Sequence, residues 1–161
     1  SFARAVAQVW RGQPVLKRRT FFQERPIRGE GVADVSWFLP TGAELSDAEW
    51  EQPQKCLGMR LAGDCIREVD ERGEPIRGDT LLVLLNAGAE GVPFALPGTG
   101  PGRVWELLFD TADDAAPASA HAGGSKYELK DHAVAVLRTR PEQAPAEEPA
   151  LQRTAGAVAG H

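Results

Sequence analysis

Residues that build disulfide frameworks and metal sites are scarce in this chain. Its 161 residues include only two cysteines, Cys56 and Cys65, and three dispersed histidines, His121, His132 and His161. Because their spacing matches no metal-ligand pattern, we expect no metal and no other cofactor. The first residues show no secretory-signal pattern, and two scattered thiols are typical of a reducing compartment, so we expect a cytoplasmic protein. Reduced packing cysteines are favoured over a disulfide, which facing strands would still permit.

Long apolar runs and an excess of basic residues are also lacking. No run approaches the roughly 18 to 20 residues of a membrane-spanning helix, so we expect no membrane partner. The net charge of −5 and the pI of about 5.2 offer no basic surface for nucleic acid. We interpret the one dense basic run, Lys17–Arg19, as a solvated turn after a helix rather than a phosphate- or partner-binding patch.

No catalytic constellation can be recognised. Asp110, Asp113 and Asp114 lie close together, but in an alanine-rich loop where a structural role is favoured. Three serines are weighed as nucleophiles, namely Ser36, Ser46 and Ser125. None has a histidine and an aspartate arranged with it as a catalytic triad. The glycine-rich run 98–102 is interrupted by proline and does not open a helix, unlike a phosphate-binding loop. The sequence therefore predicts no catalytic, cofactor-binding or metal-binding residues.

One stretch, Asp34–Trp50, organises the chain. The alternation in Val35–Leu39 predicts a strand with at least one buried face. Pro40–Gly42 is typical of a turn. Ser46 and Glu49 then form a capping-box pattern, which predicts the start of a short helix. The chain before this stretch reads as helical and the chain after it as β-structure.

The first twelve residues predict one helix. Its apolar side chains recur at helical spacing, as Phe2, Val6, Val9 and Trp10. Gly12 and Pro14 end the pattern. Because isolated helices of this length are marginal in water, the stripe must pack against something. That partner is either the β-domain of this chain or a neighbouring domain that the chain does not contain.

Short strands predict an antiparallel β-sandwich for the rest of the chain. The expected strands after residue 50 are 57–61, 80–86, 92–96, 103–110, 127–129 and 133–138. The apolar run 80–86 is typical of a central strand buried on both faces. We expect 92–96 to be its hairpin partner, with Pro93 at an edge position. We expect 64–78 to form a polar hairpin loop with Arg72 and Gly73 near its tip, and 111–125 to form a long surface loop.

Side-chain alternation in 103–110 predicts two faces. Trp105, Leu107 and Phe109 should share one face, and Val104 and Leu108 the other. After Arg140 the composition collapses to alanine, glutamate, proline and glycine, which predicts a disordered tail over 141–161. The domain division is therefore 1–31, a helix and linker, then 32–140, a sandwich of about six to eight strands, then the tail.

Four tryptophans are the remaining functional lead, because exposed aromatic rings can stack on sugars. They are Trp10, Trp37, Trp50 and Trp105. Periodicity points each of them inward, so packing is favoured over ligand binding.

The order of segments resembles the C-terminal end of isoamylase-type glycogen debranching enzymes of the α-amylase superfamily. The matching pieces are a helix leading into 14–22, the stretch 34–50, the run DTLLVLLNAGAEGVPFALP at 79–97, WELLFDT at 105–111, and 129–138. The family usually has Pro-Asp-Gly where this chain has Pro40–Gly42. The resemblance covers residues 1 to 140 and excludes the tail.

The resemblance implies that the catalytic carboxylates lie in a β/α barrel upstream of Ser1, so none is carried over to this chain. Residues 1–12 would then be the last barrel helix. The chain begins with serine rather than methionine, which we interpret as a sign of a processed, excised or truncated polypeptide. Its function would be that of an inactive C-terminal domain of an α-1,6-glucosidase, which meets glycogen or limit dextrin through the parent enzyme. The alternatives are a free-standing carbohydrate-binding module and a protein-interaction module.

Overall fold

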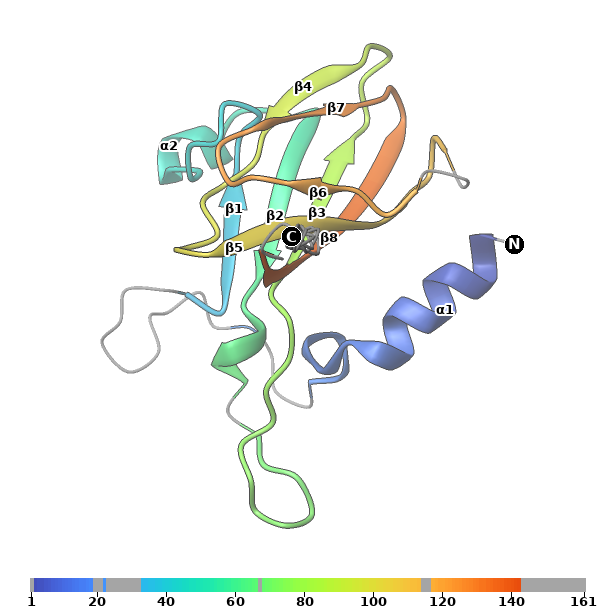
Figure 1. Ribbon diagram of the computed structural model, residues 1–161. Helices are drawn as coiled ribbons and strands as arrows, with labels where there is room; N and C mark the ends of the chain where they lie inside the picture. The colour runs from blue at the N-terminus through green and yellow to red at the C-terminus, as the bar shows by residue number, and fades with distance from the viewer. Residues whose placement is uncertain (1, 19–21, 23–32, 67, 114–116, 143–161) are drawn as a thin grey trace, which may run out of the picture.

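The computed structural model describes residues 2–18, 22, 33–66, 68–113 and 117–142 (Figure 1). The predicted linker at 24–31 and the predicted tail from 143 onward lie outside these residues.

Two antiparallel sheets make up the described β-structure, as predicted (Figure 1). The larger sheet has six strands in the order β1-β2-β3-β8-β5-β6. In that order they are Val35–Phe38, Cys56–Leu61, Leu81–Asn86, Ala133–Pro141, Arg103–Asp110 and Ala120–His121. The smaller sheet pairs β4, Val92–Ala95, with β7, Lys126–Leu129. The chain is therefore mainly β, with one long helix, α1 (Phe2–Gly12), at its N-terminal end.

The main core lies between the two sheets. Leu82 and Leu84 of β3 point inward and are fully buried, because alternation places every second side chain on the same face. Phe94 from β4 and Trp105 from β5 are also fully buried in this cluster. Gly58 of β2 makes room for it, since a Cβ at this position would lie 2.8 Å from Cζ of Phe94. The predicted central position of this strand is confirmed, since β3 lies between β2 and β8, but burial on both faces is not, because Val83 and Leu85 on the other face are half-buried.

The partner predicted for that central strand is wrong. β3 pairs with β2 and β8, whereas β4 crosses to the other sheet and pairs with β7. The side chain of Asn86 holds the crossing, because its Nδ2 donates to the carbonyls of Glu90 at 2.8 Å and Lys130 at 2.9 Å. Its Oδ1 accepts a hydrogen bond from the Gly88 N–H at 2.9 Å. Pro93 lies in this two-stranded sheet, in keeping with its predicted edge position.

A β-bulge in β5 overturns the prediction that Phe109 shares a face with Trp105 and Leu107. Leu107 pairs with Leu137, but Phe109 pairs with Val136, so Leu108 is an extra residue in this strand. The extra residue reverses the alternation. Asp110 consequently lies in the interior at 5% exposure, and Phe109 is only half-buried.

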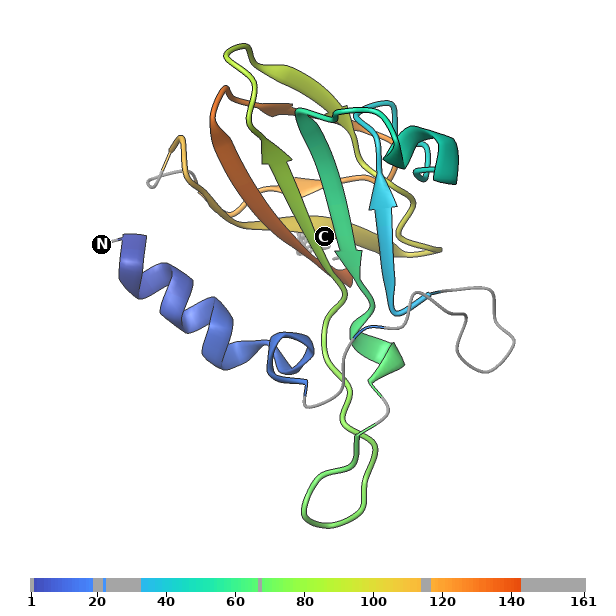
Figure 2. The same ribbon diagram turned by 180° about the vertical axis from the view of Figure 1, so that it is seen from behind.

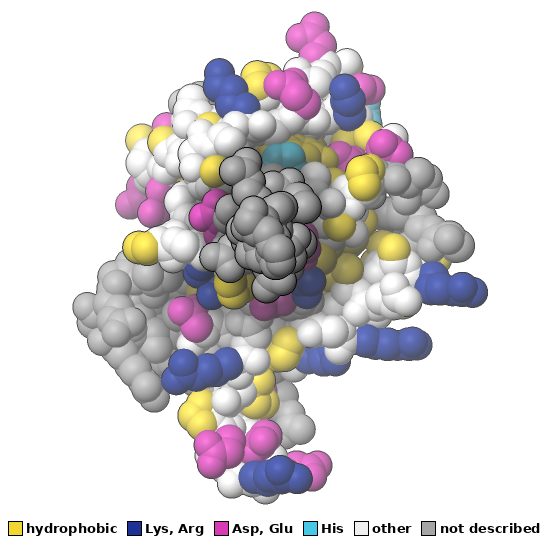
Figure 3. Space-filling model, viewed as in Figure 1, with side chains coloured by type: hydrophobic (Ala, Val, Ile, Leu, Met, Phe, Trp, Pro, Cys, Tyr) yellow, Lys and Arg dark blue, Asp and Glu magenta, His cyan; other side chains and the backbone are white. Residues whose placement is uncertain are grey.

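The polar excursion 64–78 forms the predicted hairpin loop. Val69 and Pro75 form an isolated bridge, and the Asp70 carboxylate accepts hydrogen bonds from the N–H groups of Arg72 and Glu74. Charged side chains cover the tip of this projecting loop (Figure 3). The predicted surface loop 111–125 differs from expectation in one respect, since it contains the short strand β6 paired with β5. β8 also runs beyond its predicted end at Arg138, to Pro141.

The outer face of the six-stranded sheet carries a second, smaller apolar cluster. Its buried members are Val15, Val35, Leu61, Ile66 and Leu81. Val15 comes from the 3₁₀ turn η1 (Pro14–Lys17), which follows α1. The Val15 side chain is only 1% exposed. Gln13, just before this turn, donates from Nε2 to Oδ2 of Asp79 at 3.1 Å. These contacts attach the N-terminal segment to the sheet at the lower end of the view in Figure 2.

Helix α1 itself is barely covered. No described side chain in α1 is buried, and Val6 and Trp10 are 37% and 54% exposed. Figures 1 and 2 show the helix beside the lower part of the sandwich, where it approaches β5. Of the two alternatives for its apolar stripe, packing on the β-domain of this chain is met only in part, since α1 touches β5 but buries none of its described side chains.

Deleting residues 1–12 should therefore leave the β-domain almost as stable as before, with a melting temperature lowered by less than about 2 °C. The matched comparison is Val15→Ala, which removes two buried methyl groups just after the helix. It should cost about 2 kcal/mol and several degrees. Thermal denaturation followed by circular dichroism measures both. A drop of many degrees on deletion would mean that α1 packs on this domain after all.

Candidate functional site

An apolar row crosses the outer face of the sheet and is not fully covered. Strand register places the members of this row side by side, in the order Trp37, Met59, Val83, Val136 and Phe109. All except Val136 are half-buried rather than buried. A second row beside it holds Leu57, Leu85 and Val134, also half-buried. Figure 2 shows this face of β1, β2, β3 and β8 toward the viewer, with no described element lying across its centre.

The tryptophans extend this surface at the β1 edge. Trp50 is 48% exposed, and its ring lies edge-on to Trp37 with centroids 5.3 Å apart and planes at 81°. Together with Trp10 on α1, Trp50 contradicts the prediction that all four tryptophans point inward. Helical spacing signals an apolar stripe but not whether the chain provides a partner for it. Only Trp105 is fully buried, where its Nε1 donates to the Pro97 carbonyl at 2.8 Å.

The predicted capping box positions Trp50. The helix α2 is Asp47–Trp50, and the Ser46 N–H donates to Oε2 of Glu49 at 2.8 Å. That backbone hydrogen bond, with a second from the Ser46 hydroxyl, lowers the pKa of Glu49. A single capped turn thus holds the Trp50 ring against Trp37, at the border of the outer face.

A charged network bounds the outer face on the β8–β5 side. Arg138 donates from Nε to Oε2 of Glu106 at 2.7 Å and lies 3.4 Å from Oδ2 of Asp79. The hydrogen bond that Arg138 donates to Glu106 is the main reason that the pKa of Arg138 is raised. Arg140 contacts the other Glu106 oxygen at 3.2 Å. Charge at the border and apolar side chains at the centre are the arrangement of a protein interface.

The carboxylates weighed as catalytic have structural roles. Oδ2 of Asp110 accepts a hydrogen bond of 2.5 Å from the Tyr127 hydroxyl in the interior, and Oδ1 accepts from the Ala112 N–H. Burial is the main cause that raises the pKa of Tyr127, and the hydrogen bond and charge of Asp110 add to it. Asp113 forms a β-bridge with Asp110, and Asp114 lies outside the described residues.

The serines weighed as nucleophiles are not brought together. Ser36 accepts a hydrogen bond from Arg60, Ser46 caps α2, and Ser125 donates to the Ala122 carbonyl. The structure does show one pair that the sequence reading missed. The Ser119 hydroxyl lies 2.8 Å from Nε2 of His121, whose pKa is lowered by burial. A Ser-x-His spacing on a strand was the available signal, since it places both residues on one face.

The basic run differs from its interpretation as a solvated turn. The Arg18 side chain is 4% exposed and pairs with the buried Asp34 carboxylate at 3.2 Å, with the Phe22 ring 4.5 Å from its guanidinium carbon. Lys17 is exposed, and Arg19 lies outside the described residues. Buried ion pairs of this kind join two segments in one arrangement, here η1 and the start of β1.

Cys56 is a free, buried thiol, as favoured from the sequence, and burial raises its pKa. The side chain of Cys65 lies outside the description. Within the described ranges, no group of three His, Cys, Asp or Glu residues is placed to hold a metal ion. None of the described helices is long and apolar enough to cross a membrane.

Comparison with known proteins identifies the family of this domain. Residues 34–138 match the family model described as isoamylase, C-terminal. The chain belongs to the isoamylase C-terminal family. Relatives of this domain include the glycogen operon protein GlgX homologs of Mycobacterium tuberculosis and Mycobacterium bovis, each 34% identical over 115 residues. The alignment covers 70% of this chain but only 16% of the length of each relative.

One solved structure similar to this isoamylase C-terminal domain is the trehalulose synthase MutB from Pseudomonas mesoacidophila. The two are 25% identical with a TM-score of 0.35, over 53% of this chain and 12% of the synthase.

The buried Tyr127–Asp110 pair of the isoamylase C-terminal domain should make the stability of the fold depend on pH in the alkaline range. Tyr127 is the only tyrosine, so tyrosinate absorbance reports on it alone. Because folding raises the pKa of Tyr127 above its ordinary 10.0, the stabilisation should be complete below pH 10 and decline as the pH rises further. Ionisation in the native protein should therefore be delayed until the chain unfolds, whereas the denatured chain should titrate near its ordinary value.

The variant Tyr127→Phe should remove that pH dependence. It should also lower the free energy of unfolding at neutral pH by about 1–3 kcal/mol, since Asp110 loses a buried donor. Native tyrosine that titrates like the denatured chain would show that this pair is open to solvent.

Proposed function

We propose that this chain acts as the non-catalytic C-terminal domain of a glycogen debranching enzyme that cleaves α-1,6-glucosidic bonds. The family assignment supports this proposal, as do the glycogen operon relatives, of which the chain spans about a sixth of the length. The parent enzyme would bind glycogen or limit dextrin. A cytoplasmic location is supported by the free, buried thiol of Cys56.

The observation that carries the proposal is the outer face, which this chain covers only in part, together with the largely exposed apolar stripe of α1. Both are apolar, and η1 connects them. It follows α1 directly, and its Val15 packs in the outer-face cluster. Large exposed apolar patches mark interaction sites in soluble proteins. We assign the outer face to an upstream catalytic barrel, with residues 1–31 as its last helix and the linker, and 32–140 as the sandwich that braces it.

Catalysis would reside outside this chain. Retaining and inverting glycosidases both use two carboxyl groups that face a common substrate space. In the described part of this chain, Asp110 is engaged with Tyr127, and Glu106 with Arg138 and Arg140. These contacts support a structural rather than a chemical role for the domain.

The proposal predicts that one substitution will act differently in two contexts. Val83→Ser changes the half-buried outer face, so it should move the melting temperature of this isolated chain by less than about 3 °C. In the complete polypeptide it should destabilise the junction with the barrel and reduce debranching activity. The control is Leu84→Ser in the same strand, which removes a fully buried side chain and should destabilise both by several kcal/mol, about 2–5.

Thermal melts of both forms, with reducing-sugar release from glycogen for the complete enzyme, are the measurements. An antibody against this sandwich should first detect a product several times larger than 17.3 kDa in cell extract. Equal effects of Val83→Ser in both contexts would contradict the assignment of the outer face.

A second candidate is a free-standing carbohydrate-binding module, which the Trp37–Trp50 pair favours because half-exposed indole rings stack on sugars. Migration of the isolated chain in native gels containing glycogen separates the two. We expect no retardation. Retardation that is lost in Trp50→Ala, but kept in the matched Trp10→Ala, would favour the binding module instead.

A further inference from the structure

The inner face of the large sheet is open at one end, opposite the Asn86 crossing. There the smaller sheet has already ended, at Ala95 of β4 and Lys126 of β7. A cavity of about 450 Å³ lies at this open end, and we call it the open-end cavity. Its walls come from the end of β2, the approach to β3, the loop before β5 and Thr139 of β8. A volume of this size is within the range of small-molecule sites.

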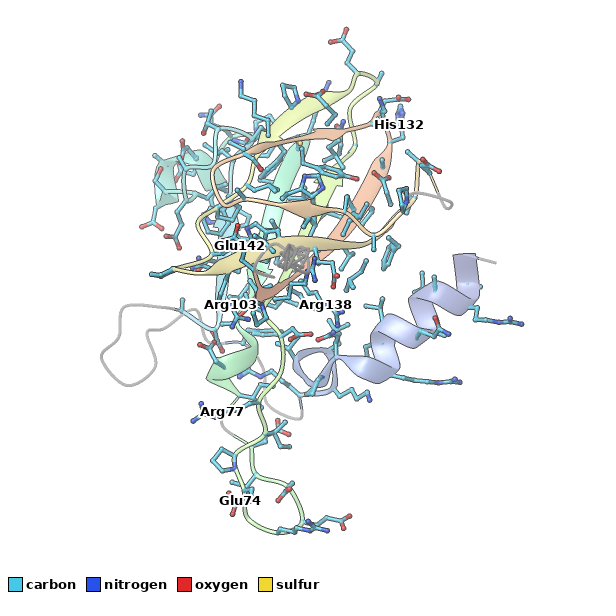
Figure 4. The ribbon with its side chains drawn as sticks, in the orientation of Figure 1. Glu74, Arg77, Arg103, His132, Arg138 and Glu142 are labelled. Carbon is cyan, nitrogen blue, oxygen red and sulfur yellow. The ribbon has the colours of Figure 1, made fainter. Side chains whose placement is uncertain are left out.

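Three arginines line the open-end cavity: Arg60, Arg77 and Arg103. Figure 4 shows Arg77 on the loop that leads into β3 and Arg103 at the start of β5, both at the lower end of the sandwich. Among the described residues, Asp64 is the only carboxylate in the cavity lining. The cavity therefore gathers positive charge in a chain whose net charge is −5.

These arginines differ from the others that pack against the sheet. Arg18, Arg138 and Arg140 each pair with a carboxylate. Within the described residues, the three cavity arginines have no carboxylate partner. Glu142 lies near Arg103, because the Glu142 N–H donates to the Gly102 carbonyl, but its carboxylate does not pair with Arg103. Arg60 donates only to the Ser36 hydroxyl and lies over the Phe38 ring, and Arg103 donates only to the Thr139 hydroxyl.

Hydrogen-bond donors therefore remain for a ligand. Each guanidinium has five N–H groups, of which Arg60 and Arg103 use one each in these contacts. Two threonine hydroxyls in the cavity lining act as acceptors, Thr80 from the Gly63 N–H and Thr139 from Arg103. An accepting hydroxyl keeps its own O–H free to donate. The cavity is thus rich in cationic and neutral donors and poor in acceptors.

We propose that the open-end cavity binds a phosphate group, either as inorganic phosphate or as the phosphomonoester of a small sugar. Donors reach it from three separate parts of the chain, which suits a tetrahedral dianion with several acceptor oxygens. The volume left beyond one phosphate is large enough for a hexose. This site lies on the inner face of the sheet, so it is separate from the outer face and does not depend on the proposed function.

Isothermal titration calorimetry of this chain tests the proposal, with sodium phosphate, glucose 6-phosphate and neutral glucose as probes at constant ionic strength. We expect saturable binding of at least one phosphate probe with a dissociation constant below about 10 mM, and none of glucose. Inorganic phosphate binding as tightly as glucose 6-phosphate assigns the site to the free anion. Glucose 6-phosphate binding about tenfold tighter assigns it to a sugar phosphate.

Matched variants locate the binding. Arg77→Gln and Arg103→Gln should each weaken binding by about tenfold, because each removes a cation from the cavity. Arg72→Gln makes the same charge change at the tip of the same loop, outside the cavity, and should leave binding unchanged. Arg77 is exposed, so Arg77→Gln gives a decisive result even if Arg103→Gln fails to fold.

Three results would overturn the proposal: no saturation with either phosphate probe, glucose binding as tight as that of its phosphate, or equal loss of affinity in Arg72→Gln. The last would show attraction to overall charge rather than a site.

Discussion

Both faces of β3 are apolar, and the rest of the structure depends on this constraint. A strand of this kind needs a layer of side chains on each side of its sheet. Over Leu82 and Leu84 the inner layer is complete, since side chains from β4 and β7 cover both. The outer layer is supplied by this chain at one end alone, where Val15 covers Leu81. Over Val83 and Leu85 the outer cover is only partial.

That incomplete layer is the reason for our proposal that the domain packs against another domain. Burial of apolar surface is the dominant favourable contribution to folding and association, so a half-covered sheet face is a reason to associate. The capped turn that presents Trp50, and the Arg138–Glu106–Arg140 network on the opposite side, bound the same surface. The interior between the sheets thus provides the stability of the domain, and in our proposal the outer surface is where another domain packs.

Much of the fold could be predicted from the sequence, because alternation and turn residues are local signals. The strands β1, β2, β3 and β8 and the α2 cap follow from such signals. Strand pairing is not local, so β4 was assigned to the wrong sheet, and a bulge such as that at Leu108 leaves no periodic trace. The exposure of Trp10 and the burial of Arg18 depend on which partner each side chain meets. For the same reason the arginine cavity could not be predicted, since its members are distant in sequence and meet only in the folded chain.

The three hydrogen bonds of Asn86 restrict which loops of the domain can be lengthened. One side chain joins the turn after β3 to the turn between β7 and β8 through the carbonyls of Glu90 and Lys130 and the N–H of Gly88. An insertion in either turn would separate partners that a single amide must reach. At the opposite end, the loop 64–78 extends beyond the sheets, and the Asp70 hydrogen bonds at its tip lie within the loop itself. The sandwich therefore has one end where its length is fixed and another where evolution, or an engineer, can add residues and new specificity.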